Sequence, residues 1–183
     1  MKTSILSLGL LPSLSLAQVV FDGTFRYDRV NCPTASVTFT PNRQSATIIF
    51  PAYEVNTAPG QQDQGCDVFF QLLWPVGCTN LIVTNDISGS VSIDPLVKAR
   101  VTRTYDVQDG TPRTFTFTTT FPDNGLSFPL RDTFSTNRTN PDAGNARREL
   151  AIRGRLNLSN FSQGQAGSLR VSSYTVNLAS GAC

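Results

Sequence analysis

Apolar and polar residues alternate with a period of two along most of this chain, and this pattern limits its fold more than any other feature. In the segment 96–108, five apolar side chains fall on one face of a strand: Val97, Ala99, Val101, Tyr105 and Val107. Arg103 interrupts that face, which places it near a rim. No stretch of ten residues carries a helical stripe. The pattern predicts β-strands with one apolar, buried face and one polar, solvent-exposed face.

The segment 113–121 repeats the alternation with larger side chains. Phe115, Phe117 and Phe121 share one face, and four threonines share the other: Thr114, Thr116, Thr118 and Thr120. Asp109-Gly110, a favourable turn dipeptide, lies between this segment and the preceding one. The two segments are therefore predicted to form a β-hairpin.

Further strands are predicted from the same alternation. They cover 19–27, 36–40, 46–55, 67–74, 81–84, 87–93 and 126–134, with two more around 149–158 and 169–178. Gly154 on an apolar face indicates a bulge or a close backbone approach, and a change of phase predicts a bulge near Ser172 or Ser173. The segments 57–65 and 137–145 are expected to be irregular. About ten strands require two packed sheets or one sheet closed on itself. We expect an all-β, antiparallel, jelly-roll-like sandwich.

The first seventeen residues have the composition of a secretory signal peptide. Lys2 supplies the positive charge, an apolar stretch follows at 5–16, and Ala17 is the small residue at the expected cleavage site before Gln18. The apolar stretch falls short of the roughly 20 residues of a membrane-spanning helix. We therefore expect a secreted, extracellular protein without a membrane anchor, and a single domain over residues 18–183.

Composition excludes several classes of function. The chain contains no histidine, which removes the Ser-His and Cys-His dyads and the commonest zinc and copper ligands. Its formal charge of +2 gives no general case for nucleic-acid binding. No metal site and no cofactor are expected.

Four cysteines occur in this exported chain: Cys32, Cys66, Cys78 and Cys183. An even number in an oxidising compartment favours two disulfides over a metal site. Three connectivities are possible.

Groups that could act on or bind a sugar are few. Glu54 and Glu149 are the only glutamates, and most aspartates lie in predicted turns, so no pair of carboxylates stands out for glycoside hydrolysis. The aromatic candidates for sugar stacking are Trp74, Tyr27, Tyr53, Tyr105 and Tyr174, for which packing in the core is the stronger interpretation. Calcium binding near Asp106, Asp109 or the segment 63–67 lacks a dense ligand motif.

Three sequons predict N-linked glycans at Asn137, Asn157 and Asn160. The last two lie so close together that we expect single rather than dual occupancy.

A family resemblance rests on the first half of the chain. Asn31-Cys32-Pro33, the strand pattern leading to Tyr53, and Cys66 nine residues before Pro75 in Trp74-Pro75-Val76-Gly77 resemble a secreted, mainly fungal family known as domain of unknown function 4360. The resemblance implies secretion, a β-rich fold and disulfides. The family's order of cysteines implies the pair Cys32–Cys66, which leaves Cys78 for Cys183. It implies no catalytic residues.

Together these features predict a monomeric, non-enzymatic protein of the extracellular space or cell wall, with effector-like contact to a host as the specific hypothesis. The expected partner is a cell-wall polysaccharide or a host protein. The alternative function is a carbohydrate-binding module or a carboxylate-dependent carbohydrate-active enzyme.

Overall fold

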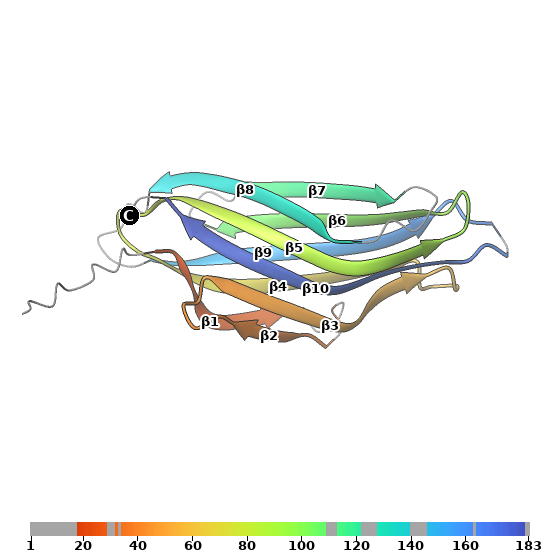
Figure 1. Cartoon of the computed structure of the whole chain (residues 1–183), viewed down its shortest axis with the longest axis horizontal. Helices are drawn as coiled ribbons and strands as arrows, with labels where there is room; N and C mark the ends of the chain where they lie inside the picture. The colour runs from red at the N-terminus through yellow and green to blue at the C-terminus, as the bar shows by residue number, and fades with distance from the viewer. Residues whose placement is uncertain are drawn as a thin grey trace, which may run out of the picture.

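The chain folds into ten β-strands (Figure 1). A computed structural model describes residues 18–28, 32, 34–108, 113–121, 128–139, 146–162 and 164–181, without the side chains of 137–139. The strands are β1 (Val20–Tyr27), β2 (Ser36–Phe39), β3 (Ser45–Asn56), β4 (Asp63–Trp74), β5 (Thr79–Ile93), β6 (Lys98–Gln108), β7 (Arg113–Phe121), β8 (Leu130–Thr139), β9 (Ala146–Ser159) and β10 (Gly167–Ser180).

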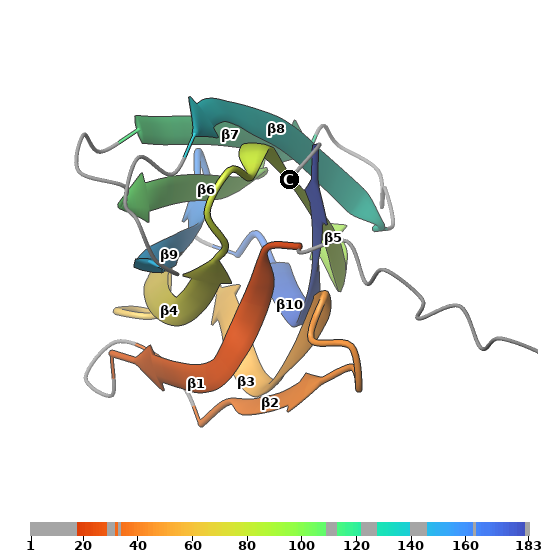
Figure 2. The ribbon, with the colours of Figure 1, turned by 90° about the vertical axis from the view of Figure 1, so that its left-hand side faces the viewer.

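The strands form two five-stranded sheets, which face each other as a sandwich. One sheet has the order β1-β4-β9-β6-β7 and the other β2-β3-β10-β5-β8, and every pairing is antiparallel. Figure 2 looks at the sandwich from one end, with β7 and β8 along its upper side and β1 and β2 along its lower side. The predicted antiparallel sandwich is confirmed.

Inward-facing side chains of both sheets build one apolar core, because each strand turns every second residue inward. The largest fully buried side chains include Tyr53, Trp74, Tyr105 and Tyr174. The hairpin predicted around Asp109 is confirmed as β6 and β7, with Tyr105 opposite Phe115.

Some predicted boundaries were wrong. The separate pieces 81–84 and 87–93 form one long strand, β5, because its backbone pairs with β10 on one side and β8 on the other. Asp86, assigned to a turn, lies inside that strand and binds Arg131. β4 begins at Asp63, inside the predicted irregular segment 57–65. The bulge expected near Ser172 is confirmed by a register shift between Val171 and Ser173.

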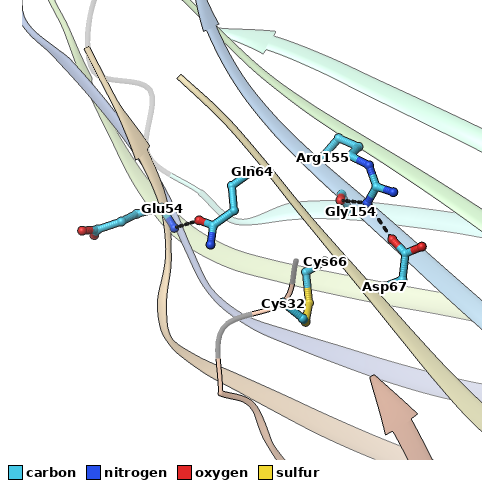
Figure 3. The surroundings of a disulfide bond; sticks show 7 residues. All are labelled: Cys32, Glu54, Gln64, Cys66, Asp67, Gly154 and Arg155. Carbon is cyan, nitrogen blue, oxygen red and sulfur yellow. Dashed lines mark hydrogen bonds and ion pairs between the residues drawn. A yellow bond between two sulfur atoms is a disulfide. The ribbon is translucent and has the colours of Figure 1, made fainter. Parts of the chain in front are cut away.

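One disulfide is present among the described residues. Cys32, which precedes β2, is linked to Cys66 on β4 (Figure 3), so the bond joins the entry of one sheet to a strand of the other. Cys78 is fully buried, and none of the described cysteines is free. Cys183 lies outside the described residues, as do the predicted signal peptide and its last residue, Ala17. The described part of the chain contains no helix long and apolar enough to cross a bilayer.

Candidate functional site: the outer face of the β1-β4-β9-β6-β7 sheet

The outer face of the β1-β4-β9-β6-β7 sheet carries a series of ion pairs that we call the charged ladder. It consists of Arg26, Asp67, Asp106, Glu149, Arg153 and Arg155. These residues come from β1, β4, β6 and β9, and strand pairing aligns them: Asp67 lies opposite Arg153, which lies opposite Thr104. The sheet thus supplies a rigid frame for charges distant in the sequence.

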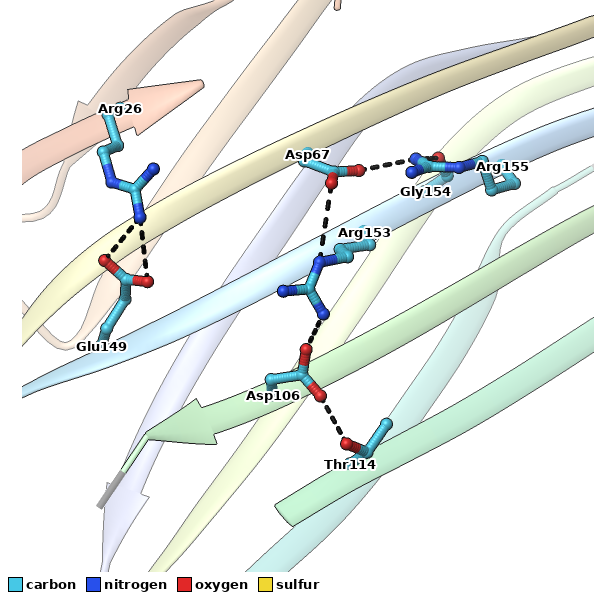
Figure 4. Close-up of polar contacts among 8 residues, drawn as sticks. All are labelled: Arg26, Asp67, Asp106, Thr114, Glu149, Arg153, Gly154 and Arg155. Carbon is cyan, nitrogen blue, oxygen red and sulfur yellow. Dashed lines mark hydrogen bonds and ion pairs between the residues drawn. The ribbon is translucent and has the colours of Figure 1, made fainter. Parts of the chain in front are cut away.

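Asp67 sits between two arginines of β9 (Figure 4). Arg155 donates from Nη1 to Oδ1 of Asp67 at 2.6 Å, and Arg153 Nε lies 3.5 Å from Oδ2. The same Arg155 nitrogen also donates to the Gly154 carbonyl at 2.7 Å. The hydrogen bond to Asp67 raises the pKa of the Arg155 guanidinium. The arginine therefore remains charged.

The ladder continues across β9 to the β6–β7 hairpin. Arg153 also donates to Asp106, whose other oxygen accepts a hydrogen bond from Thr114 Oγ1 at 2.6 Å. Ala151 shares this face but is fully buried between Phe69 and Asp106 of the neighbouring strands. The ladder therefore packs over the sheet rather than projecting freely from it.

The remaining ion pair of the ladder, Arg26–Glu149, lies at the β1 side. Arg26 donates from Nη2 to both oxygens of Glu149, at 3.1 and 3.0 Å, and Gln71 donates to the same carboxylate at 3.1 Å. The Arg26 guanidinium also lies over the Phe69 ring, 3.8 Å from its centre, in cation–π geometry. The Arg26 side chain is still 63% exposed, so it is anchored yet accessible.

A shallow pocket opens beside Arg26. It has a volume of about 190 Å³ and is lined by Thr24, Phe25, Arg26, Phe69 and Gln71. Phe25 is 37% exposed, and its ring stacks on that of Tyr27 with 6.4 Å between centres. The pocket thus combines aromatic carbon with a guanidinium, an amide and a hydroxyl.

The predicted aromatic candidates lie elsewhere. Trp74, Tyr53, Tyr105 and Tyr174 are buried, which confirms the core interpretation for these four, and Tyr27 is partly buried. Phe69, which sequence analysis did not propose for binding, lies on the outer face beneath Arg26. The adjacent pair Phe69-Phe70 indicated that one of the two rings faces outward, because two adjacent strand residues cannot both face inward.

A second pocket lies at the β3–β4 end of the molecule. It encloses about 300 Å³ and is lined by Glu54 and Asp63, together with Ala52, Asn56, Gly60, Gln61 and Gln64. Gln64 accepts a hydrogen bond from the Glu54 backbone N–H at 2.9 Å, and Figure 3 shows the Glu54 carboxylate directed away from that contact. Two acidic residues that sequence analysis did not pair thus line one pocket, and the Asp63 carboxylate also accepts a hydrogen bond from Asn157 of β9.

Among the described residues, the predicted carboxylates do not assemble a calcium site. Asp106 is occupied by Arg153 and Thr114, Asp67 by the two arginines, and Asp109 lies outside the described residues. Within the described ranges, no cluster of three or more Asp, Glu, His or Cys side chains could hold a metal ion.

Arg103, expected near a rim, is instead buried between the sheets, where it binds Asp132 of β8. Tyr105 donates to the same carboxylate at 2.6 Å, and Asn85 donates to the Tyr105 hydroxyl at 2.8 Å. Burial lowers the pKa of Arg103, but the hydrogen bond and charge of Asp132 outweigh it and raise the pKa. This network lies in the core, away from solvent, and joins the two sheets.

The predicted glycan acceptors occupy different environments. Asn157 lies within β9, and Asn160 directly follows that strand. The backbone of Asn137 belongs to β8, but its side chain lies outside the described part of the structure.

Comparisons with known proteins identify the family of the chain. The model of the family described as "Domain of unknown function (DUF4360)" matches residues 31–181. No curated protein matches the sequence.

Among solved structures, the chain is similar to TmCBM61 in complex with β-1,4-galactotriose, with 10% identity, a TM-score of 0.36, and coverage of 84% of this chain and 88% of that one. It is also similar to the xylan-binding module CBM15, with 13% identity, a TM-score of 0.28, and coverage of 90% and 96%. A third similar structure is the enzymatically active domain of bacteriophage CBA120 tailspike protein 4, with 10% identity and a TM-score of 0.33. There the match covers 87% of this chain but 19% of that chain. These likenesses are too distant to assign a ligand or an activity.

Proposed function

We propose that this chain, which belongs to the domain of unknown function 4360 family, is a secreted, non-enzymatic domain that binds an extracellular polysaccharide, such as one of the cell wall. The binding surface would be the outer face of the β1-β4-β9-β6-β7 sheet. The observation that carries the proposal is the pocket in which the Phe69 ring lies beside Arg26 and Gln71, with Thr24 and Phe25 completing the lining.

The chemistry of this pocket suits a sugar. A sugar ring presents apolar C–H groups on its faces and hydroxyls around its edge, so it is bound by aromatic carbon beside directional polar groups. Arg26 and Gln71 are both held by Glu149, which fixes the directions of their remaining donors. The charged ladder extends these fixed polar groups across the sheet, as a polymer would require.

The ladder supports binding rather than hydrolysis. Two catalytic carboxylates must flank the glycosidic bond with room for the sugar between them. Asp67, Asp106 and Glu149 instead face arginines of the protein. Their oxygens are engaged in holding the face together.

The proposal includes secretion of the protein and the formation of its disulfide bonds in an oxidising compartment. The Cys32–Cys66 bond is the kind of link that persists in an oxidising compartment, and residues 1–17 carry the signal-peptide pattern. We include a second link, Cys78–Cys183, in the proposal because none of the described cysteines is free.

A glycan array combined with a polysaccharide-degradation screen tests this proposal. Binding without turnover is the expected result. Turnover would contradict the non-enzymatic assignment, and failure to bind any glycan would favour a protein partner, such as one of a host, instead.

A carbohydrate-active enzyme is the second candidate, because Glu54 and Asp63 line one cavity of about 300 Å³. If the degradation screen finds turnover, Glu54→Gln and Asp63→Asn should each abolish it, while Arg26→Ala should spare it. Turnover that survives both carboxylate substitutions would exclude this pocket.

A further inference from the structure

We propose that Asn160 is the N-glycan acceptor of the segment 157–162 and that Asn157 stays unmodified. In the reaction, an oligosaccharide passes from a lipid-diphosphate donor of the secretory pathway to the asparagine amide. A bond forms between Nδ2 and C1 of the sugar, the bond from C1 to the diphosphate oxygen breaks, and Nδ2 loses one proton. The inference does not depend on the proposed ligand.

Asn157 is engaged inside the sheet. It lies on β9 with Asp63 of β4 opposite it on one side and Arg100 of β6 on the other. Its Nδ2 donates to Asp63 Oδ1 at 2.7 Å, and the residue is half-buried. A glycan on this nitrogen would replace one of its two hydrogens. The glycan would also have to fit between the side chains of the two flanking strands.

Asn160 is presented outward at the end of the same strand. It follows Ser159, is exposed, and has a φ of 59°, in the left-handed region that asparagine tolerates better than most residues. Among the described residues, its side chain makes no hydrogen bond, so Nδ2 is available.

The residues after Asn160 hold this position in place. Phe161 packs against the core, and Ser162 donates from its backbone N–H to Gln165 Oε1 at 2.8 Å. The segment is therefore a defined turn with one asparagine directed to solvent.

The two positions differ in what a glycan would cover. Asn157 is two residues from Arg155 on the ladder face. Asn160 lies five residues beyond the same arginine and past the end of β9, at most about 16 Å along an extended chain. A glycan at Asn160 would leave the centre of the charged ladder uncovered.

The test is the intact mass of the full chain secreted from a eukaryotic host, before and after peptide N-glycosidase treatment. All variants carry Asn137→Gln, which removes the third sequon. Asn160→Gln and Ser162→Ala should each lose the whole glycosidase-sensitive mass, whereas Ser162→Thr, which keeps the sequon, should retain it.

Ser159→Ala is the matched control, because it destroys the Asn157 sequon but leaves the Asn157–Asp63 hydrogen bond possible. It should keep the full glycan mass. The inference is overturned if the glycan survives Asn160→Gln, if Ser159→Ala removes it, or if the Asn137→Gln parent carries none.

Discussion

Arg103 and Asp132 form a two-point ion pair across the interior of the sandwich. Arg103 Nη2 lies 2.7 Å from Asp132 Oδ1, and Nε lies 2.9 Å from Oδ2. Arg103 belongs to β6 of one sheet and Asp132 to β8 of the other, and their side chains are only 3% and 2% exposed. The pair therefore fixes how the two sheets sit on each other at this edge.

Asp132→Asn is predicted to destabilise the fold by ~3–5 kcal/mol, because it leaves the buried Arg103 charge without its counterion. Urea unfolding measures the loss. Asp86→Asn is the matched control, because it removes the carboxylate of an Arg–Asp pair that faces solvent on the sheet that also carries Asp132. Asp86→Asn should lower the free energy of unfolding far less than Asp132→Asn does. Equal losses of unfolding free energy in the two variants would mean that the buried ion pair stabilises the fold no more than the exposed pair does.

The fold is predicted to require glycine at position 154, because there is no room for a side chain there. A Cβ there would lie 2.6 Å from the Tyr174 hydroxyl oxygen and 2.7 Å from that of Tyr53, and both tyrosines are fully buried. Gly154→Ala should therefore cost ~1–3 kcal/mol of unfolding free energy. In Gly65→Ala, the Cβ would meet only the movable end of the partly exposed Arg155 side chain, so the loss should be smaller. A larger loss for Gly65→Ala would contradict this account.

The fold should lose stability in alkali. Burial raises the pKa of Tyr53 and of Tyr174, so each keeps its proton in the folded state at a pH where the unfolded chain releases it. Their contribution is complete below pH ~10 and falls as pH rises further, by ~1.4 kcal/mol per pH unit for each tyrosine.

Tyr53→Phe and Tyr174→Phe should each make this alkaline decline less steep. Their cost at neutral pH should be small, because neither hydroxyl has a hydrogen-bond partner in the described part of the chain. Urea unfolding at neutral pH and in steps above pH 10 measures both effects. An unchanged alkaline slope in both variants would contradict the burial argument.

The disulfide account predicts two separate links. Peptide mapping without reduction should recover one peptide pair joining Cys32 to Cys66 and another joining Cys78 to Cys183. Each link should stabilise the fold by ~3–5 kcal/mol in the chain-entropy model. A peptide joining Cys32 to Cys78 would contradict the pairing.

The alternation of side chains was enough to predict the sandwich. In and just before β6, the apolar positions from Val97 to Val107 predicted the correct buried face, because a period of two shows which side of a strand is apolar. Arg103 was misplaced for the same reason. The local pattern shows that a charge interrupts the face, but its partner, Asp132, lies 29 residues away on a strand of the other sheet.

The candidate site was hardly accessible from sequence. Asp67 meets Arg155, 88 positions later in the sequence, only because β4 pairs with β9. Arg26 and Glu149 are 123 residues apart. Local periodicity contains no information on which strands become neighbours, so the ladder could not be assembled, although each of its residues could be placed on a polar face.

Binding of the secreted protein to the polysaccharide selected by the glycan array tests the central claim most directly. The measurement compares wild type with Arg26→Ala, at the aromatic pocket, and Arg131→Ala, which removes an exposed arginine paired with an aspartate on the opposite outer face. We predict that Arg26→Ala weakens binding at least about tenfold and that Arg131→Ala leaves it unchanged. Equal affinity of all three proteins would contradict the assignment of this face.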